Sequence, residues 1–117
     1  MKRDMDLIRA VLLKAQQSDP NGTIDGRTDD ELKYHRALAI DAGLLKGSVV
    51  KDNTKGTEIP AAVMVKDLTW EGHDLLDAIE NDSNWVKVKE FLRSAGKQLT
   101  IETIKFAVKQ LFGIGGS

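Results

Sequence analysis

The chain has 117 residues, of which 41% are hydrophobic and 30% are charged, with 17 Lys and Arg against 18 Asp and Glu and no Cys. A chain of this length can close one hydrophobic core. The absence of cysteine excludes disulfides, CxxC redox sites and thiolate zinc sites. The net charge of −1 argues against a surface built throughout for nucleic acid.

Neither a membrane span nor a signal peptide is predicted. No apolar run approaches the ~18 residues that a membrane-spanning helix needs. The first residues, MKRDMDLIRA, lack an apolar core followed by a small-residue cleavage site. We therefore expect a soluble, cytoplasmic protein.

Apolar residues at helical spacing predict five helices. The predicted ranges are 4–17, 28–42, 70–80, 84–95 and 101–112. Thr28 and Glu31 fit a capping box at the start of the second helix, and Gly43 follows its end. Thr69 and Thr100 are predicted to cap the third and the fifth helix.

Between residues 44 and 68 the pattern becomes typical of β-strands. The runs 44–50 and 59–65 favour β-strands, and a polar loop with a glycine joins them, which predicts a β-hairpin. Pro60 indicates a strand entry or an edge position. A short extended piece around Thr23 and Ile24 is expected after the turn at 18–22.

This order of elements is typical of an α+β winged-helix domain: helix, short strand, helix and β-hairpin wing, here followed by additional C-terminal helices. In that fold the helix before the hairpin is the recognition helix. The segment between residues 17 and 28 leaves no room for a separate second helix. We expect one domain over residues 1–112 and a flexible tail over 113–117.

Several segments of the chain resemble a known family. These segments are MKRDMDLIR (1–9), KYHRAL (33–38), DAGLL (41–45), LTWEGHDLLD (68–77) and DSNWVKVK (82–89). Together they are similar to the domain-of-unknown-function family 2513 of bacteria and prophages, and TWEGH is the most specific string. The resemblance implies a small cytoplasmic winged-helix-like protein, often carried by mobile elements. It implies no activity, cofactor or catalytic residue.

The predicted recognition helix has few donors for DNA on its outer face. That face carries two positive and three negative residues together with two apolar ones: Asp29, Asp30, Lys33, Arg36, Ala37, Ile40 and Asp41. Base edges and phosphates need hydrogen-bond donors, so the helix fits DNA poorly. If DNA is bound, we expect Lys33 and Arg36 nearest the major groove. The phosphate contacts would then come from Arg27, Lys46, Lys51 and Lys55.

Protein contacts are the other use for these surfaces. Ala37 and Ile40 are apolar residues on the predicted outer face, and Phe106 lies off the apolar arc of the last helix. That arc is wide and includes Leu111, so a homodimer or another protein partner would bury the surplus. Alternatively the arc closes the monomer core, and Phe106 packs against the loop before its helix.

The two histidines and Trp70 are the remaining candidates for a site. His35 lies on the core-facing arc of its helix, which predicts a buried, hydrogen-bonded histidine rather than a metal ligand. His73 lies one turn before Asp77, which predicts a surface pair. Trp70 precedes His73 by three residues and is expected to anchor the hairpin to the following helices, with a small recognition site as the alternative.

Catalytic motifs are not recognisable in the sequence. No nucleophile stands beside a base at a known spacing, and no phosphate-binding loop is present. We expect no enzymatic activity, cofactor, metal or small-molecule substrate. The sequence favours a non-enzymatic regulatory or accessory protein of a bacterial mobile element that acts through protein contacts; a DNA-binding winged-helix regulator is the alternative.

Overall fold

The computed structural model describes residues 1–52 and 58–113. Within them the chain is α+β, with five helices and one two-stranded antiparallel sheet. In chain order the elements are α1 (Met5–Gln16), α2 (Asp29–Asp41), β1 (Leu45–Val50), β2 (Ala62–Leu68), α3 (Trp70–Ile79), α4 (Asp82–Ser94) and α5 (Ile101–Phe112). The predicted tail begins at Gly113, and its residues 114–117 lie outside the described part.

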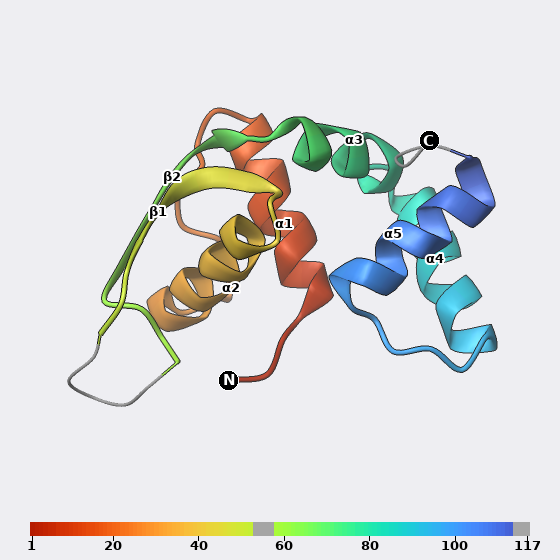
Figure 1. Cartoon of the computed structure of the whole chain (residues 1–117), viewed down its shortest axis with the longest axis horizontal. Coiled ribbons are helices and arrows are strands. Elements are labelled where there is room, and N and C mark those ends of the chain that lie inside the picture. Colours follow the sequence, from red (N-terminus) through yellow and green to blue (C-terminus); the bar gives the residue numbers. More distant parts are fainter. Residues whose placement is uncertain (53–57, 114–117) are drawn as a thin grey trace.

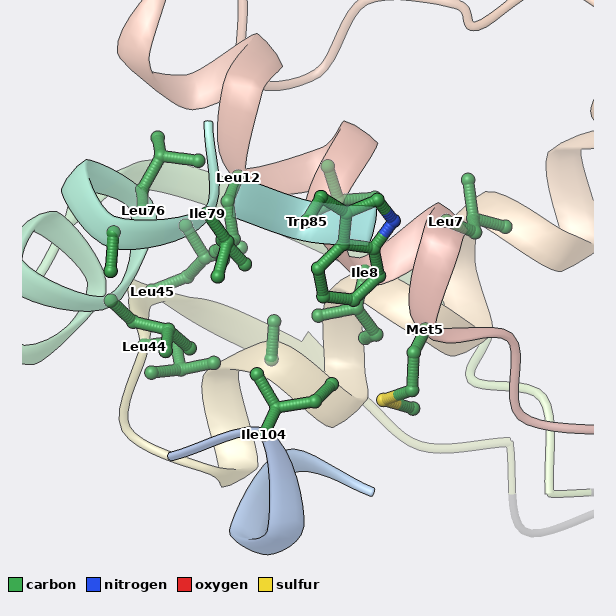
Figure 2. Packing of buried hydrophobic residues seen from close by; sticks show 14 of the residues in the cluster. Met5, Leu7, Ile8, Leu12, Leu44, Leu45, Leu76, Ile79, Trp85 and Ile104 are labelled. Atoms are coloured by element: carbon green, nitrogen blue, oxygen red, sulfur yellow. The ribbon is translucent and has the colours of Figure 1, made fainter. Parts of the chain in front are cut away.

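Helix α1 lies between two halves of the molecule, one formed by α2 and the β1–β2 hairpin and the other by α3, α4 and α5 (Figure 1). It packs against α2 and the β1–β2 hairpin on one side and against α3 on the other, while α3, α4 and α5 pack on one another. One cluster of buried apolar side chains runs through both halves. Figure 2 shows its members converging from α1, β1, α3, α4 and α5, among them Leu12, Leu45, Leu76, Trp85 and Ile104.

The predicted helices are confirmed, with boundaries that differ by two residues at most. Thr28 accepts a hydrogen bond from the Glu31 N–H, and the Glu31 carboxylate accepts one from the Thr28 N–H, so the capping box is formed. Gly43 has a φ of 78°, a left-handed conformation that a side chain would oppose. These local signals fix both ends of α2, the helix on which the hairpin packs.

The hairpin is confirmed, but its second strand begins later than the sequence pattern predicts. β2 covers Ala62–Leu68 instead of 59–65, because Leu68 pairs with Leu45 and Ala62 with Val50. Pro60 has no N–H to donate to the ladder, and the Ala61 N–H bonds the Val50 carbonyl oxygen before the strand starts. The loop residues 53–57 lie outside the described part.

The short strand predicted around Thr23 and Ile24 is wrong: no strand forms in that segment. The side-chain amide of Asn21 instead bonds the edge of β2, because its Nδ2 donates to the Val65 carbonyl oxygen and its Oδ1 accepts from the Val65 N–H, both at 2.9 Å. These are the backbone groups that a third strand would pair with. One side chain thus takes the place of a strand.

Two side chains, Arg9 of α1 and Trp85 of α4, join α1 to the C-terminal half of the molecule. The guanidinium of Arg9 donates to the carbonyl oxygens of Ile79 and Glu80, which end that helix, and pairs with Asp82. The buried indole of Trp85 donates to Asp6 at 2.7 Å. The C-terminal half is therefore fixed to α1 by polar contacts as well as by the core.

At Gly72, helix α3 closely approaches Leu44 in the connection between α2 and β1. A Cβ at this position would meet the carbonyl oxygen of Leu44 and a side-chain carbon of Leu68. We predict that Gly72→Ala destabilises the fold by about 1–3 kcal/mol through overpacking, measured as a lower urea midpoint. His73→Ala at the exposed neighbouring position is the control and should change the midpoint little; equal effects of both variants would contradict the close approach.

Candidate functional site

The start of α2 is tied to the start of α1 by a closed set of polar contacts. His35 is fully buried; its Nε2 accepts from the Asp4 N–H at 2.9 Å, and its Nδ1 lies 2.8 Å from the Glu31 carbonyl oxygen. Since Nε2 accepts, Nδ1 carries the proton and donates. Arg27 pairs with the carboxylates of Asp4 at 2.9 Å and Glu31 at 3.2 Å. His35 is thus a structural residue facing the core, where the helical pattern placed it.

These contacts set the charge of the two carboxyls. Burial would raise the pKa of Asp4, but the hydrogen bond from Arg27 and the backbone N–H of Leu7 outweigh it, so its pKa lies below the ordinary 3.8. The hydrogen bond from the Thr28 N–H lowers the pKa of Glu31 most; burial raises it, and the hydrogen bond from Arg27 lowers it again, so the pKa lies below the ordinary 4.5. The carboxyl groups of Asp4 and Glu31 therefore stabilise the folded state when they are ionised.

The lowered pKa values predict a pH dependence of stability that Arg27 controls. Because both folded pKa values lie below the unfolded ones, the stabilisation is complete above about pH 5 and is lost as the pH falls through the folded pKa values. Arg27→Gln should lower the stability of the protein at neutral pH and reduce the further loss of stability on acidification. Urea midpoints at about pH 7 and pH 3 measure this.

Lys66→Gln provides the control for Arg27→Gln, because Lys66 is exposed and takes part in no ion pair among the described residues. It should keep the wild-type difference in urea midpoint between the two pH values. The account of Arg27 fails if Arg27→Gln keeps that difference too.

The prediction that Arg36 lies on the outer face of α2 is wrong. Its side chain is only 6% exposed, and its Nη2 donates to the Gly22 carbonyl oxygen at 2.5 Å. Its Nε has no hydrogen-bond partner in the described part of the chain. Burial lowers the pKa of the guanidinium, and the charges of Asp29 and Asp19 oppose this. Helix α2 packs against both α1 and the hairpin, so two of its faces are covered. The prediction assumed a single core-facing arc and therefore placed Arg36 on the outside.

The other predicted DNA contacts are spread over different surroundings. Lys33 is half-buried and pairs with Asp29 at 3.3 Å, and Arg27 is held by its two carboxylates. Lys46 and Lys51 are exposed on the hairpin. Lys55 lies outside the described residues. Of the described members of this set, only the two hairpin lysines are exposed, so the structure does not gather the set into one basic surface.

The structure does bring together Ala37 and Ile40, the two apolar residues predicted on the outer face. Both are half-buried and line a groove of about 510 Å³ between α2 and the hairpin. The apolar part of the lining is Tyr34, Ala37, Leu38, Ile40, Val49, Ile59 and Pro60, and the charged part is Asp41, Lys51, Asp52 and Glu58. We call this the α2–hairpin groove.

Sequence reasoning missed most of the groove. Tyr34 is buried although it lies off the predicted core arc, because the hairpin gives α2 a second packing partner. The walls contributed by Ile59 and Pro60 depend on where the hairpin folds back over the helix. The sequence pattern of one segment does not contain that information. Only the register of the hairpin would have placed Ile59 and Pro60 on the groove.

The expectation that Trp70 anchors the hairpin is wrong, because its side chain is 84% exposed. Gly72, Leu75 and Leu76 form the buried side of α3, and a spacing of 100° per residue places Trp70 about 160° from Gly72. That signal was available in the sequence. His73 is exposed on the same side, and no ion pair joins it to Asp77 among the described residues.

Phe106 and Leu111 of α5 lie on the surface, with exposures of 44% and 39%. Ile104, Ala107 and Val108 fill the core from the same helix. Phe106 contacts Phe91 with a centroid distance of 6.2 Å, and the Nζ of Lys97 lies 5.6 Å from its ring centroid. Phe106 thus contacts the loop before its helix and still exposes part of its ring.

Neither a metal cluster nor a membrane span is found where the structure is described. Within residues 1–52 and 58–113, no three His, Asp or Glu side chains come close enough to share a metal ion. None of the helices in those ranges has the length and apolarity needed to cross a bilayer.

Comparison with known proteins identifies the family. The family described as "Hypothetical protein (DUF2513)" matches residues 2–98. The chain belongs to this family. A protein of Haemophilus influenzae strain Rd, described as an uncharacterized protein, is 37% identical over 111 residues and 90% of each chain is covered. No solved structure matches. The DUF2513 match includes the α2–hairpin groove and α3, and it ends before α5.

Proposed function

We propose that this DUF2513 protein is a non-enzymatic regulatory or accessory protein of a bacterial mobile element, which acts in the cytoplasm by binding another protein. The mobile-element context comes from the family resemblance of the sequence. The observation that carries the protein-binding role is the α2–hairpin groove, which gathers Ala37 and Ile40 into one concave apolar surface.

The size and lining of the groove favour an apolar side chain of a partner. A volume of about 510 Å³ accommodates one or two large side chains, and energetic hot spots of interfaces are anchors seated in such pockets. Three carboxylates and one lysine stand among its lining residues. Glu58 is already paired with the N-terminal ammonium group of Met1, but Asp41 is exposed and takes part in no ion pair among the described residues. The proposed partner therefore presents an apolar anchor beside a Lys or Arg.

The N-terminal half is proposed to be a reduced winged helix. The order α1, α2, β1, β2 supports this, with α2 in the place of the recognition helix and the hairpin as the wing. The segment between α1 and α2 forms neither a second helix nor a strand, and the Asn21 amide occupies the edge of β2. In this proposal a winged-helix framework presents a groove for protein instead of a helix for DNA.

The groove can be tested by site-specific photo-crosslinking in cells. A photo-reactive residue at position 37 should form an adduct with a protein, and the same residue at position 66 on the hairpin should not form it. The adduct protein is then purified and its affinity is measured. Ala37→Arg, which fills the groove and adds a repelling charge, should weaken binding about tenfold or more.

Lys66→Glu is the control for the binding measurement and should leave the affinity unchanged. The proposal fails if the purified adduct protein does not bind, if it binds the Ala37→Arg variant as well as the wild type, or if position 37 crosslinks to nucleic acid. Thermal unfolding should show that both variants keep the wild-type fold.

DNA binding remains a second candidate, favoured by the exposed Lys46 and Lys51 on the hairpin. The internal pairing of Arg27 and Lys33 and the burial of Arg36 weigh against it. A salt titration of binding to random duplex DNA decides this, because each phosphate contact steepens the loss of affinity with salt. A steep loss would favour a DNA-binding regulator.

A further inference from the structure

Helix α3 presents an exposed stripe that pairs with no other side chain among the described residues. Trp70, His73, Asp74 and Asp77 recur at helical spacing and are all exposed, opposite the buried side of the helix. Among the large apolar side chains that the structure describes, that of Trp70 is the most exposed. A tryptophan ring offers a large apolar contact area together with a polar N–H, and tryptophan is enriched at protein interfaces. We call these four residues the α3 stripe.

The surroundings of the α3 stripe are strongly acidic. Residues 67–82 hold six Asp and Glu and no Lys or Arg. Inside the molecule Glu71 pairs with Lys105, and Asp82 with Arg9. Asp74 and Asp77 take part in no ion pair among the described residues. Lys105 lines a small pocket with Asp74 but pairs with Glu71. The stripe therefore combines an aromatic ring with two carboxylates that form no ion pair within the described residues.

The following two helices carry the opposite charge. Residues 83–112 hold six Lys and Arg against two Glu. Lys89 and Lys105 are engaged with Asp6 and Glu71. Lys87, Arg93 and Lys109 are exposed and take part in no ion pair among the described residues. Lys87 lies four residues before Phe91, Lys109 lies three residues after Phe106, and these two rings contact each other, so the two lysines flank one aromatic pair. With the partly exposed Phe106, which Lys97 covers on one side, Lys87 and Lys109 form what we call the α4–α5 basic surface.

We infer that copies of this chain associate with one another, the α3 stripe of one copy contacting the α4–α5 basic surface of another. Each surface combines an exposed aromatic ring with charges that form no ion pair within the described residues. The charges of the two surfaces are opposite, so the surfaces attract each other. The face of Trp70 can receive a Lys or Arg by a cation–π contact. Within one copy these helices already pack through their buried sides, so the exposed sides are left for a second copy.

This inference is independent of the α2–hairpin groove, which lies on other elements. Ala37→Arg should therefore self-associate like the wild type, and loss of groove binding would leave the inference standing. Since most of the contact is electrostatic, the association should weaken strongly between about 0.1 M and 1 M salt, where the Debye length falls from about 10 Å to 3 Å.

A charge exchange tests the inference by sedimentation velocity. The wild type should show a mass that rises with concentration at low salt. Lys87→Glu with Lys109→Glu should abolish this rise, and Asp74→Lys with Asp77→Lys should do the same. All four side chains are exposed, so folding should be kept, as circular dichroism can verify. An equimolar mixture of the two variants should associate again, because the acidic α4–α5 surface of one variant then meets the basic α3 stripe of the other.

Lys66→Glu on the hairpin is the matched control and should associate like the wild type. The inference is overturned by a wild type that stays monomeric at every concentration, by variants that still associate on their own, or by a mixture that does not associate. A monomeric wild type whose binding to duplex DNA is lost in the Lys87 and Lys109 variant would assign the basic surface to nucleic acid instead.

Discussion

The imidazole of His35 is held between two backbone groups, the N–H of Asp4 and the carbonyl oxygen of Glu31, and this sets how α2 lies on α1. Displacing it would leave a backbone N–H without a partner, at a cost of about 1–3 kcal/mol. Arg27 spans the carboxylates of Asp4 and Glu31 beside it. The hairpin packs on α2, so the α2–hairpin groove depends on this junction.

The same junction decides which charges remain for binding. Because α2 is covered by α1 and by the hairpin, its basic residues serve the fold: Arg36 is buried and Lys33 pairs with Asp29. In the proposed winged helix, α2 takes the place of the helix that reads DNA, and its two basic residues are buried or paired within the molecule. The surfaces with exposed apolar area or unpaired charge are the α2–hairpin groove, which α2 lines together with the hairpin, and the outer sides of the three C-terminal helices.

The sequence was sufficient for features with a local cause. The capping box at Thr28 and the left-handed Gly43 depend on neighbouring residues only, and α+β with a hairpin followed from periodicity. The burial of Arg36, the pairing of Asn21 with Val65 and the lining of the groove depend on segments distant in sequence. The exposure of Trp70 could have been found, since it lies opposite the buried side of α3.

We propose that α2 supports the fold and does not read DNA. The side-chain Nε–H signals of Arg27 and Arg36, together with the α2 amides, can be followed by nitrogen–proton correlation NMR while random duplex DNA is added at low salt. The account predicts that these signals stay in place, even if Lys46 and Lys51 respond. A progressive shift of the α2 amides and of Arg36 Nε–H would contradict it.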